Sequence, residues 1–150
     1  MTISALLSPE RVFPDTEISS KKKLLELVAT TVSDQTGLPQ SALFNNLLDR
    51  ERLGSTGLGK GFAVPHARLK SLDQALGYFY RLNTPINFEA QDNQPVDLVF
   101  TIIVPEEATE EHLIILSSLA GIFSKPEVCD AIRKAPSSAD ILQIIELAEQ

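Results

Sequence analysis

The feature that most constrains the fold is a nearly unbroken apolar run from Val96 to Val104, which reads Val-Asp-Leu-Val-Phe-Thr-Ile-Ile-Val. A continuous run of this kind is typical of a strand that is buried on both faces of a sheet. Helical patterns occur on both sides of the run, over residues 20–35 before it and residues 109–123 after it. The sequence therefore predicts an α/β (α+β) fold with a single mixed β-sheet flanked by helices.

Further elements follow from the same periodicities. We expect a second helix over residues 39–52, a short strand over residues 62–64 and an aromatic-rich strand over residues 75–82. A short helix over residues 126–134 and a last helix over residues 141–149 should complete the chain. Residues before the first helix look irregular or partly extended, because prolines interrupt them.

Composition excludes several classes of function. A chain of 150 residues suits one domain, over residues 1–150, with a sizeable core. The formal net charge of −7 argues against general nucleic-acid binding, which usually needs a basic face. The single cysteine, Cys129, excludes an internal disulfide framework. No apolar stretch approaches the ~18 residues of a membrane span and no secretory signal is visible, so we expect a cytoplasmic protein without a membrane span.

Chemically active residue types concentrate between Arg50 and Arg68, in Arg-Glu-Arg-Leu-Gly-Ser-Thr-Gly-Leu-Gly-Lys-Gly-Phe-Ala-Val-Pro-His-Ala-Arg. Glycines allow backbone N–H groups to approach a ligand, and the basic side chains supply positive charge. His66 could act as nucleophile or base. The segment predicts a phosphate-handling site built around His66, with the glycines of residues 57–61 presenting N–H groups nearby.

Common phosphate-binding motifs do not fit this segment. Gly54 to Lys60 meets the first part of the P-loop pattern, but Gly61 stands where a serine or threonine should hold Mg²⁺. The segment also follows a helical pattern and leads to Pro65, whereas a P-loop follows a strand and opens a helix. The dinucleotide fingerprint fails because Phe62 occupies the place of its third glycine. The sequence therefore disfavours a nucleotide-binding loop.

The second histidine, His112, lies near the start of the helix expected over residues 109–123. There the macrodipole favours a nearby anion and disfavours an imidazolium. A neutral His112 could donate an N–H to a phosphoryl oxygen, and a capping or packing role is the alternative. A zinc site is weakly supported, because His66 and His112 stand far apart without a cysteine cluster. We expect neither a metal nor a cofactor.

Residues 61–68 read Gly-Phe-Ala-Val-Pro-His-Ala-Arg, and Arg-Glu and Gly-Ser-Thr-Gly precede them. This pattern closely resembles the enzyme IIA domains of the fructose/mannitol class of the bacterial phosphotransferase system. Residues 83–88, Asn-Thr-Pro-Ile-Asn-Phe, and residues 92–98, Asp-Asn-Gln-Pro-Val-Asp-Leu, resemble its stand-alone, nitrogen-regulatory branch. The resemblance runs over essentially the whole chain, and it implies the IIA fructose/mannitol-type fold.

The resemblance also implies a phosphocarrier of the phosphoenolpyruvate-dependent phosphotransferase system. His66 matches the family histidine that accepts a phosphoryl group from a small HPr-like or NPr-like phosphocarrier protein. His112 matches the histidine that assists by hydrogen bonding to that group, and Arg50 matches an arginine near the phosphorylation site. The chain departs from many relatives at Ala67 and Arg68, where they carry Gly-Lys or Gly-Arg, so the backbone beside His66 is more restricted.

Several functions remain open on the sequence. The first is a regulatory phosphotransferase of the nitrogen/potassium type, which signals through its phosphorylation state to a potassium transporter or a sensor kinase. The second is a sugar-specific IIA that passes phosphate to a separate fructose or mannitol IIB protein. The third is a binding module that has lost phosphorylation, against which the intact pair of His66 and His112 weighs.

Charge adds an expectation about regulation. Although the chain is acidic overall, Arg50, Arg52, Lys60 and Arg68 lie close to His66 in the sequence and predict a local positive patch. A phosphoryl group would cancel much of that patch. A partner that docks acidic groups there should therefore prefer the unphosphorylated form.

Overall fold

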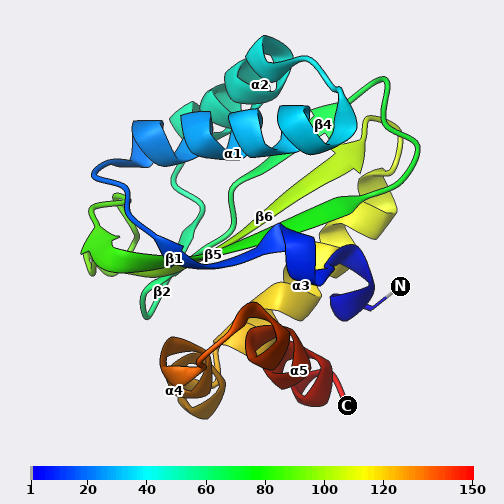
Figure 1. The fold of residues 1–150 in the computed structure, drawn as a ribbon. Helices are drawn as coiled ribbons and strands as arrows, with labels where there is room; N and C mark the ends of the chain where they lie inside the picture. Colours follow the sequence, from blue (N-terminus) through cyan, green and yellow to red (C-terminus); the bar gives the residue numbers. More distant parts are fainter. Residues whose placement is uncertain (1) are drawn as a thin grey trace.

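The computed structural model describes residues 2–150, and of Thr109 the backbone alone. Across these residues one mixed sheet lies between two layers of helices (Figure 1). One face is covered by α1 (Lys21–Thr36) and α2 (Gln40–Leu53), and the other by α3 (Thr109–Phe123), α4 (Pro126–Lys134) and α5 (Ser138–Ala148). The predicted fold class is confirmed.

The sheet has the strand order β1-β5-β6-β3-β2, and β4 also pairs with β6. The strands are β1 (Val12–Thr16), β2 (Gly57–Gly59), β3 (Phe62–Ala63), β4 (His66–Leu69), β5 (Leu76–Ile86) and β6 (Val96–Pro105). β6 runs antiparallel to β5 and parallel to β3 and β4. It is buried along almost its whole length, as the apolar run predicts.

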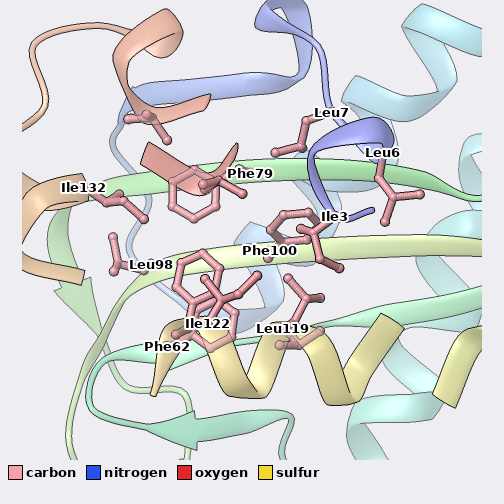
Figure 2. Packing of buried hydrophobic residues seen from close by; sticks show 14 of the residues in the cluster. Ile3, Leu6, Leu7, Phe62, Phe79, Leu98, Phe100, Leu119, Ile122 and Ile132 are labelled. Atoms are coloured by element: carbon pink, nitrogen blue, oxygen red, sulfur yellow. The ribbon is translucent and has the colours of Figure 1, made fainter. Parts of the chain in front are cut away.

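Two hydrophobic cores fill the space between the sheet and its helices. Beneath α3, α4 and α5, Phe62, Phe79 and Phe100 pack with Leu119 and other aliphatic side chains (Figure 2). On the other face, α1 and α2 pack against Tyr78 and Tyr80 of β5. Both α2 and α3 are thereby anchored on the sheet. This anchoring positions two residues of the predicted site, because α2 carries Arg50 and α3 carries His112.

Capping residues set the ends of α1 and the start of α5. The hydroxyl of Ser20 accepts the N–H of Lys23 at 3.2 Å at the start of α1. Gly37 ends that helix with a φ of 79°, a conformation that suits glycine. The hydroxyl of Ser137 accepts the N–H of Asp140 at 3.2 Å, so α5 begins ahead of the expected residue 141.

The glycine-rich segment before His66 belongs to the sheet. Residues 57–63 form a tight hairpin of β2 and β3, whose turn holds Lys60 and Gly61 at φ values of 58° and 84°. Phe62 lies opposite Leu98 on β6 and His66 lies opposite Ile102, so β3 and β4 keep one register. Pro65 lacks an N–H and interrupts the ladder between them. The strand expected over residues 62–64 is thus present as β3, and a second short strand, β4, begins at His66.

Candidate functional site

The imidazole of His66 lies at the start of β4 and is 8% exposed. Its Nδ1 is 2.8 Å from the carbonyl oxygen of Val64, and the Nε of Arg50 donates to its Nε2 at 3.1 Å. A guanidinium only donates hydrogen bonds, so Nε2 carries a lone pair. The proton of the neutral ring is therefore on Nδ1, where it is donated to Val64.

Burial lowers the pKa of His66 below its ordinary value. The carbonyl of Val64 opposes this effect, and the positive charges of Arg50 and Arg68 add to it. His66 is consequently a neutral imidazole near neutral pH, with an unprotonated nitrogen available as a nucleophile.

The ring of His112 lies edge-on to that of His66, with the centroids 4.8 Å apart and the planes at 71°. His112 sits in the first turn of α3 and is 5% exposed. Arg68 donates its Nε to Nδ1 of His112 at 3.3 Å, whereas Nε2 is buried without a partner in the described part of the chain. Burial is the largest cause that lowers the pKa of His112, to about 4, followed by repulsion from His66 when that ring is protonated and by the charges of Arg68 and Arg50.

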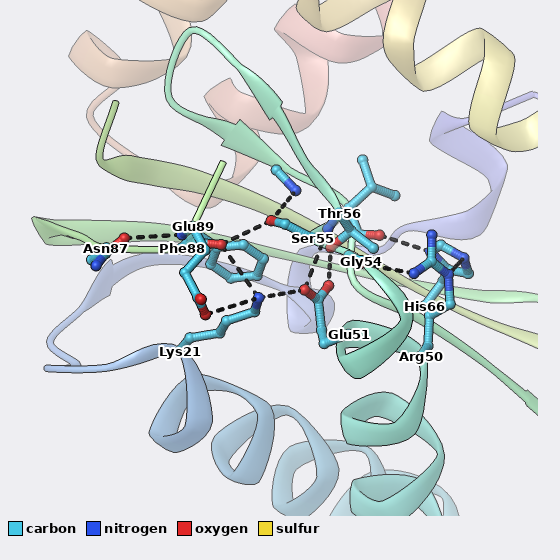
Figure 3. Close-up of polar contacts among 12 residues, drawn as sticks. Lys21, Arg50, Glu51, Gly54, Ser55, Thr56, His66, Asn87, Phe88 and Glu89 are labelled. Atoms are coloured by element: carbon cyan, nitrogen blue, oxygen red, sulfur yellow. Dashed lines mark hydrogen bonds and ion pairs between the residues drawn. The ribbon is translucent and has the colours of Figure 1, made fainter. Parts of the chain in front are cut away.

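Arg50 links the end of α2 to the histidine pair. Its Nη1 donates to the carbonyl of Gly54 at 2.9 Å while its Nε contacts His66 (Figure 3). These groups border a pocket of about 440 Å³, lined by Asn46, Asp49, Arg50, Leu53, His66, Ala67, Arg68 and His112. The structure thus brings His66, His112 and Arg50, the three residues that the resemblance implies, to one pocket.

The prediction that the glycines and all four nearby basic residues surround His66 is wrong. No glycine of residues 57–61 lines this pocket, because the hairpin packs closely against other parts of the chain, such as Ala90 and Asp92. The Nζ of Lys60 donates to the carbonyl of Ser124 at 3.3 Å, and Arg52 faces Asp49 at 3.6 Å. Of the four basic residues that are close in sequence, only Arg50 and Arg68 line the pocket.

A buried polar cluster lies on the other side of α2 from the pocket (Figure 3). Glu51, only 7% exposed, pairs with Nζ of Lys21 at 2.7 Å and accepts the N–H and hydroxyl of Thr56. Lys21 also donates to the carbonyl of Phe88 at 3.3 Å. The cluster fixes the last turn of α2 next to Arg50. Sequence reasoning missed it, because nothing in the Arg-Glu pair shows that Glu51 points inward.

Among residues 2–150, no group of three or more His, Cys, Asp or Glu side chains is placed to hold a metal ion. No helix in the described chain is long and apolar enough to cross a membrane.

The arrangement suits an incoming phosphoryl group. The pocket offers an unprotonated nitrogen on His66, an unpartnered donor on His112, and the guanidinium groups of Arg50 and Arg68. Guanidinium groups match the geometry of phosphate oxygens. Transfer of a phosphoryl group depends mainly on positioning and on stabilisation of charge. The site therefore has the parts that a histidine-based phosphoryl acceptor needs.

Comparisons with known proteins point the same way. The "Nitrogen regulatory protein" of Bradyrhizobium diazoefficiens is 37% identical over 147 residues, which cover 98% of this chain and 96% of that protein. The crystal structure of nitrogen regulatory protein IIA-Ntr from Neisseria meningitidis superposes with a TM-score of 0.91 at 39% identity, covering 95% of this chain and 98% of that one.

A sugar-related protein is also similar. The fructose-specific EIIABC component of Bacillus subtilis is 32% identical over 97% of this chain, which corresponds to 23% of that longer protein. The family model described as "Phosphoenolpyruvate-dependent sugar phosphotransferase system, EIIA 2" matches residues 5–148. With this match over nearly its whole length, the chain belongs to the EIIA type 2 family of the phosphoenolpyruvate-dependent sugar phosphotransferase system.

Proposed function

We propose that this protein is a histidine phosphocarrier that accepts a phosphoryl group on Nε2 of His66 from an HPr-like or NPr-like phosphocarrier protein. The protonation state of the His66 ring is the observation that supports this proposal most directly. Val64 holds the proton on Nδ1, and Nε2 is left with its lone pair beside the pocket. Nε2 is therefore the nucleophile.

The bonds and charges of the transfer balance between the two histidines, without a cofactor. Nε2 of His66 attacks the phosphorus of the donor's protonated phosphohistidine, and the donor's N–P bond breaks as the new one forms. The donor leaves as a neutral imidazole, and the positive charge passes to His66. The carbonyl of Val64 accepts the Nδ1–H and stabilises that charge.

The neighbouring donors hold the phosphoryl oxygens in this scheme. Arg50 exchanges its bond to Nε2 of His66 for a bond to an oxygen, which clears the lone pair for attack. The buried Nε2–H of His112 gains the partner that it otherwise lacks. Donors that are already in place stabilise the charge of the transition state at little reorganisation cost.

A regulatory role agrees best with the relatives. The protein named "Nitrogen regulatory protein" matches this chain over almost the full length of both, whereas the fructose-specific relative shares only a part of its length. In this role the phosphorylation state signals to a target such as a potassium transporter or a sensor kinase. The second candidate is a sugar-specific IIA, which the similarity to the fructose component supports.

Mass spectrometry after incubation with phosphoenolpyruvate and the phosphocarrier chain tests the proposal. We expect the wild type to gain one phosphoryl group that is acid-labile and alkali-stable, and His66→Ala to gain none. His112→Ala should fold and still accept the label, but about ten- to a hundredfold more slowly, because one hydrogen bond to the transferring group is lost. Full acid-labile labelling of His66→Ala contradicts the assignment, and an unlabelled wild type favours a pure binding module.

A second assay separates the regulatory and sugar-specific roles. The phosphorylated protein is mixed with purified fructose and mannitol IIB proteins, and loss of its label is followed over time. We expect the label to stay on His66. Rapid transfer to either IIB protein identifies the sugar-specific role instead.

A further inference from the structure

Arg68 determines which nitrogen of His112 can carry a proton. Its Nε donates to Nδ1 of His112 at 3.3 Å. A guanidinium remains protonated and has no acceptor, so Nδ1 of His112 must be the unprotonated nitrogen. The proton of the neutral ring then lies on Nε2, which is the buried atom without a partner among residues 2–150.

The two histidines consequently hold opposite tautomers. His66 carries its proton on Nδ1, and two contacts fix it there: the carbonyl of Val64 and the Nε of Arg50. His112 carries its proton on Nε2, and within the described chain the contact with Arg68 is the single hydrogen bond to its ring. The tautomer of His66 thus rests on Val64 and Arg50, whereas that of His112 rests on Arg68 alone.

The strand places Arg68 where it can do this. Alternate residues of a strand point to the same side, so Arg68 projects from β4 beside His66, whereas Ala67 is buried against the core. Asn46 on α2 donates its side-chain amide to the carbonyl of Arg68 at 3.0 Å, which holds this part of β4 against α2. The guanidinium then reaches across the pocket to the first turn of α3.

We propose that Arg68 is a positioning residue that sets the tautomer of His112 and so presents its Nε2–H to the phosphoryl group on His66. The proposal rests on the proposed function and deepens it. Arg68 acts through His112 in this role. Without Arg68, Nδ1 of His112 would be free to hold the proton, and the atom that faces the phosphoryl group could not donate.

Nitrogen-15 spectra of the imidazole rings in the unphosphorylated protein test the proposal directly. We expect Nδ1 of His112 to be unprotonated in the wild type at neutral pH. Arg68→Glu replaces a donor by a carboxylate, which only accepts, so Nδ1 should become protonated in that variant. The pKa of His112, about 4 in the wild type, should rise as well, because a negative charge replaces a positive one.

Arg52→Glu is the matched control. It makes the same change of charge near the end of α2, where Arg52 is 69% exposed and faces Asp49 instead of a histidine. The ring of His112 should keep its wild-type spectrum in this variant. Transfer to His66 should be at least about tenfold slower in Arg68→Glu than in Arg52→Glu, and Arg68→Lys, which keeps a donor, should recover most of the rate.

The outcomes separate this proposal from the proposed function. A protonated Nδ1 of His112 in the wild type, or an unprotonated Nδ1 in Arg68→Glu, overturns the role of Arg68 even if His66 is phosphorylated normally. If the wild type accepts no phosphoryl group, the proposed function fails and the role of Arg68 in transfer fails with it. The spectra alone then decide whether Arg68 controls the His112 ring.

Discussion

At the scale of single residues, the pocket works by keeping two imidazoles neutral in a positively charged setting. Burial and nearby guanidinium groups lower the pKa of both His66 and His112. A neutral His66 has a lone pair to offer, and a neutral His112 has one N–H to donate. Arg50 donates to the His66 ring and Arg68 to the His112 ring, so each guanidinium adds positive charge beside the imidazole that it contacts.

Arg50→Gln should slow transfer to His66 by about ten- to a hundredfold, because one charge-assisted hydrogen bond to the transferring group is lost. The fold should survive, since Arg50 is partly exposed. Arg52→Gln removes the same charge from the same helix outside the pocket and should keep the wild-type rate. Single-turnover transfer from the phosphocarrier measures both, and equal rates for Arg50→Gln and the wild type exclude a role for Arg50.

The depressed pKa of His112 predicts a pH dependence of stability. The unfolded chain takes up a proton on His112 near its ordinary pKa of 6.5, whereas the native protein does so near 4. Between these values the unfolded state binds more protons, so the free energy of unfolding falls as the pH is lowered. Between about pH 7.5 and about pH 5, His112 should contribute a loss of about 2 kcal/mol.

Chemical denaturation of the wild type and His112→Gln at both pH values measures this contribution. The variant should lose less stability than the wild type on acidification, because its side chain does not titrate. A constant difference between the two proteins across this range contradicts the predicted pKa shift.

At the scale of elements, the site depends on how α2, β4 and α3 are held together. Pro65 ends the ladder of β3 and lets β4 resume in the same register, which places His66 opposite Ile102. The cluster of Lys21, Glu51 and Thr56 ties the last turn of α2 to α1 and to the loop before β2. Arg50, which precedes Glu51, reaches the pocket from this anchored turn.

Glu51→Gln should lower the free energy of unfolding by about 3 kcal/mol, because it removes the buried carboxylate that pairs with the largely buried Lys21. Glu89→Gln is the matched control: Glu89 faces the same Lys21 at 3.8 Å but is 76% exposed. Its removal should cost less than about 1 kcal/mol. Denaturant unfolding of both variants checks this prediction, and equal losses would show that burial does not strengthen the Glu51 pair.

Some of these features could be predicted from the sequence and others could not. The apolar run of residues 96–104 and the amphipathic helices around it depend on local periodicity, so the fold class could be predicted. His66 could be selected from its glycine-rich, basic setting, whereas the role of His112 followed only from the resemblance to the family. The contact of Arg68 with His112 and the inward direction of Glu51 depend on how separate elements pack, so one sequence could not reveal them.

The misassigned glycines show the same limit. Residues 57–61 combine glycines with Lys60, a composition typical of a phosphate-binding loop. In the fold they make a tight hairpin whose turn packs against the side chains of Asp92, Asp97 and Arg133. Close packing of a hairpin and binding of an anion make the same demand for small residues, so composition alone cannot distinguish them.

At the scale of the whole molecule, an acidic chain with a net charge of −7 places the guanidinium groups of Arg50 and Arg68 in the pocket around His66, together with one carboxylate, that of Asp49. Phosphorylation adds about −1.5 to −2 charges at neutral pH, which offsets the charges of Arg50 and Arg68. A regulatory target with acidic groups at this pocket should therefore bind the unphosphorylated form more tightly, by about 1–3 kcal/mol. Calorimetric titration of both forms with the target measures the difference. Equal affinities would contradict the predicted preference for the unphosphorylated form.

The central claim is that Nε2 of His66 accepts the phosphoryl group while Nδ1 keeps its proton on the carbonyl of Val64. Nitrogen-15 and phosphorus-31 spectra of the phosphorylated protein, labelled at its histidine rings, test this claim most directly. The structure predicts a phosphorus coupling to Nε2 of His66 and a protonated Nδ1. A coupling to Nδ1 of His66, or to either nitrogen of His112, would contradict it.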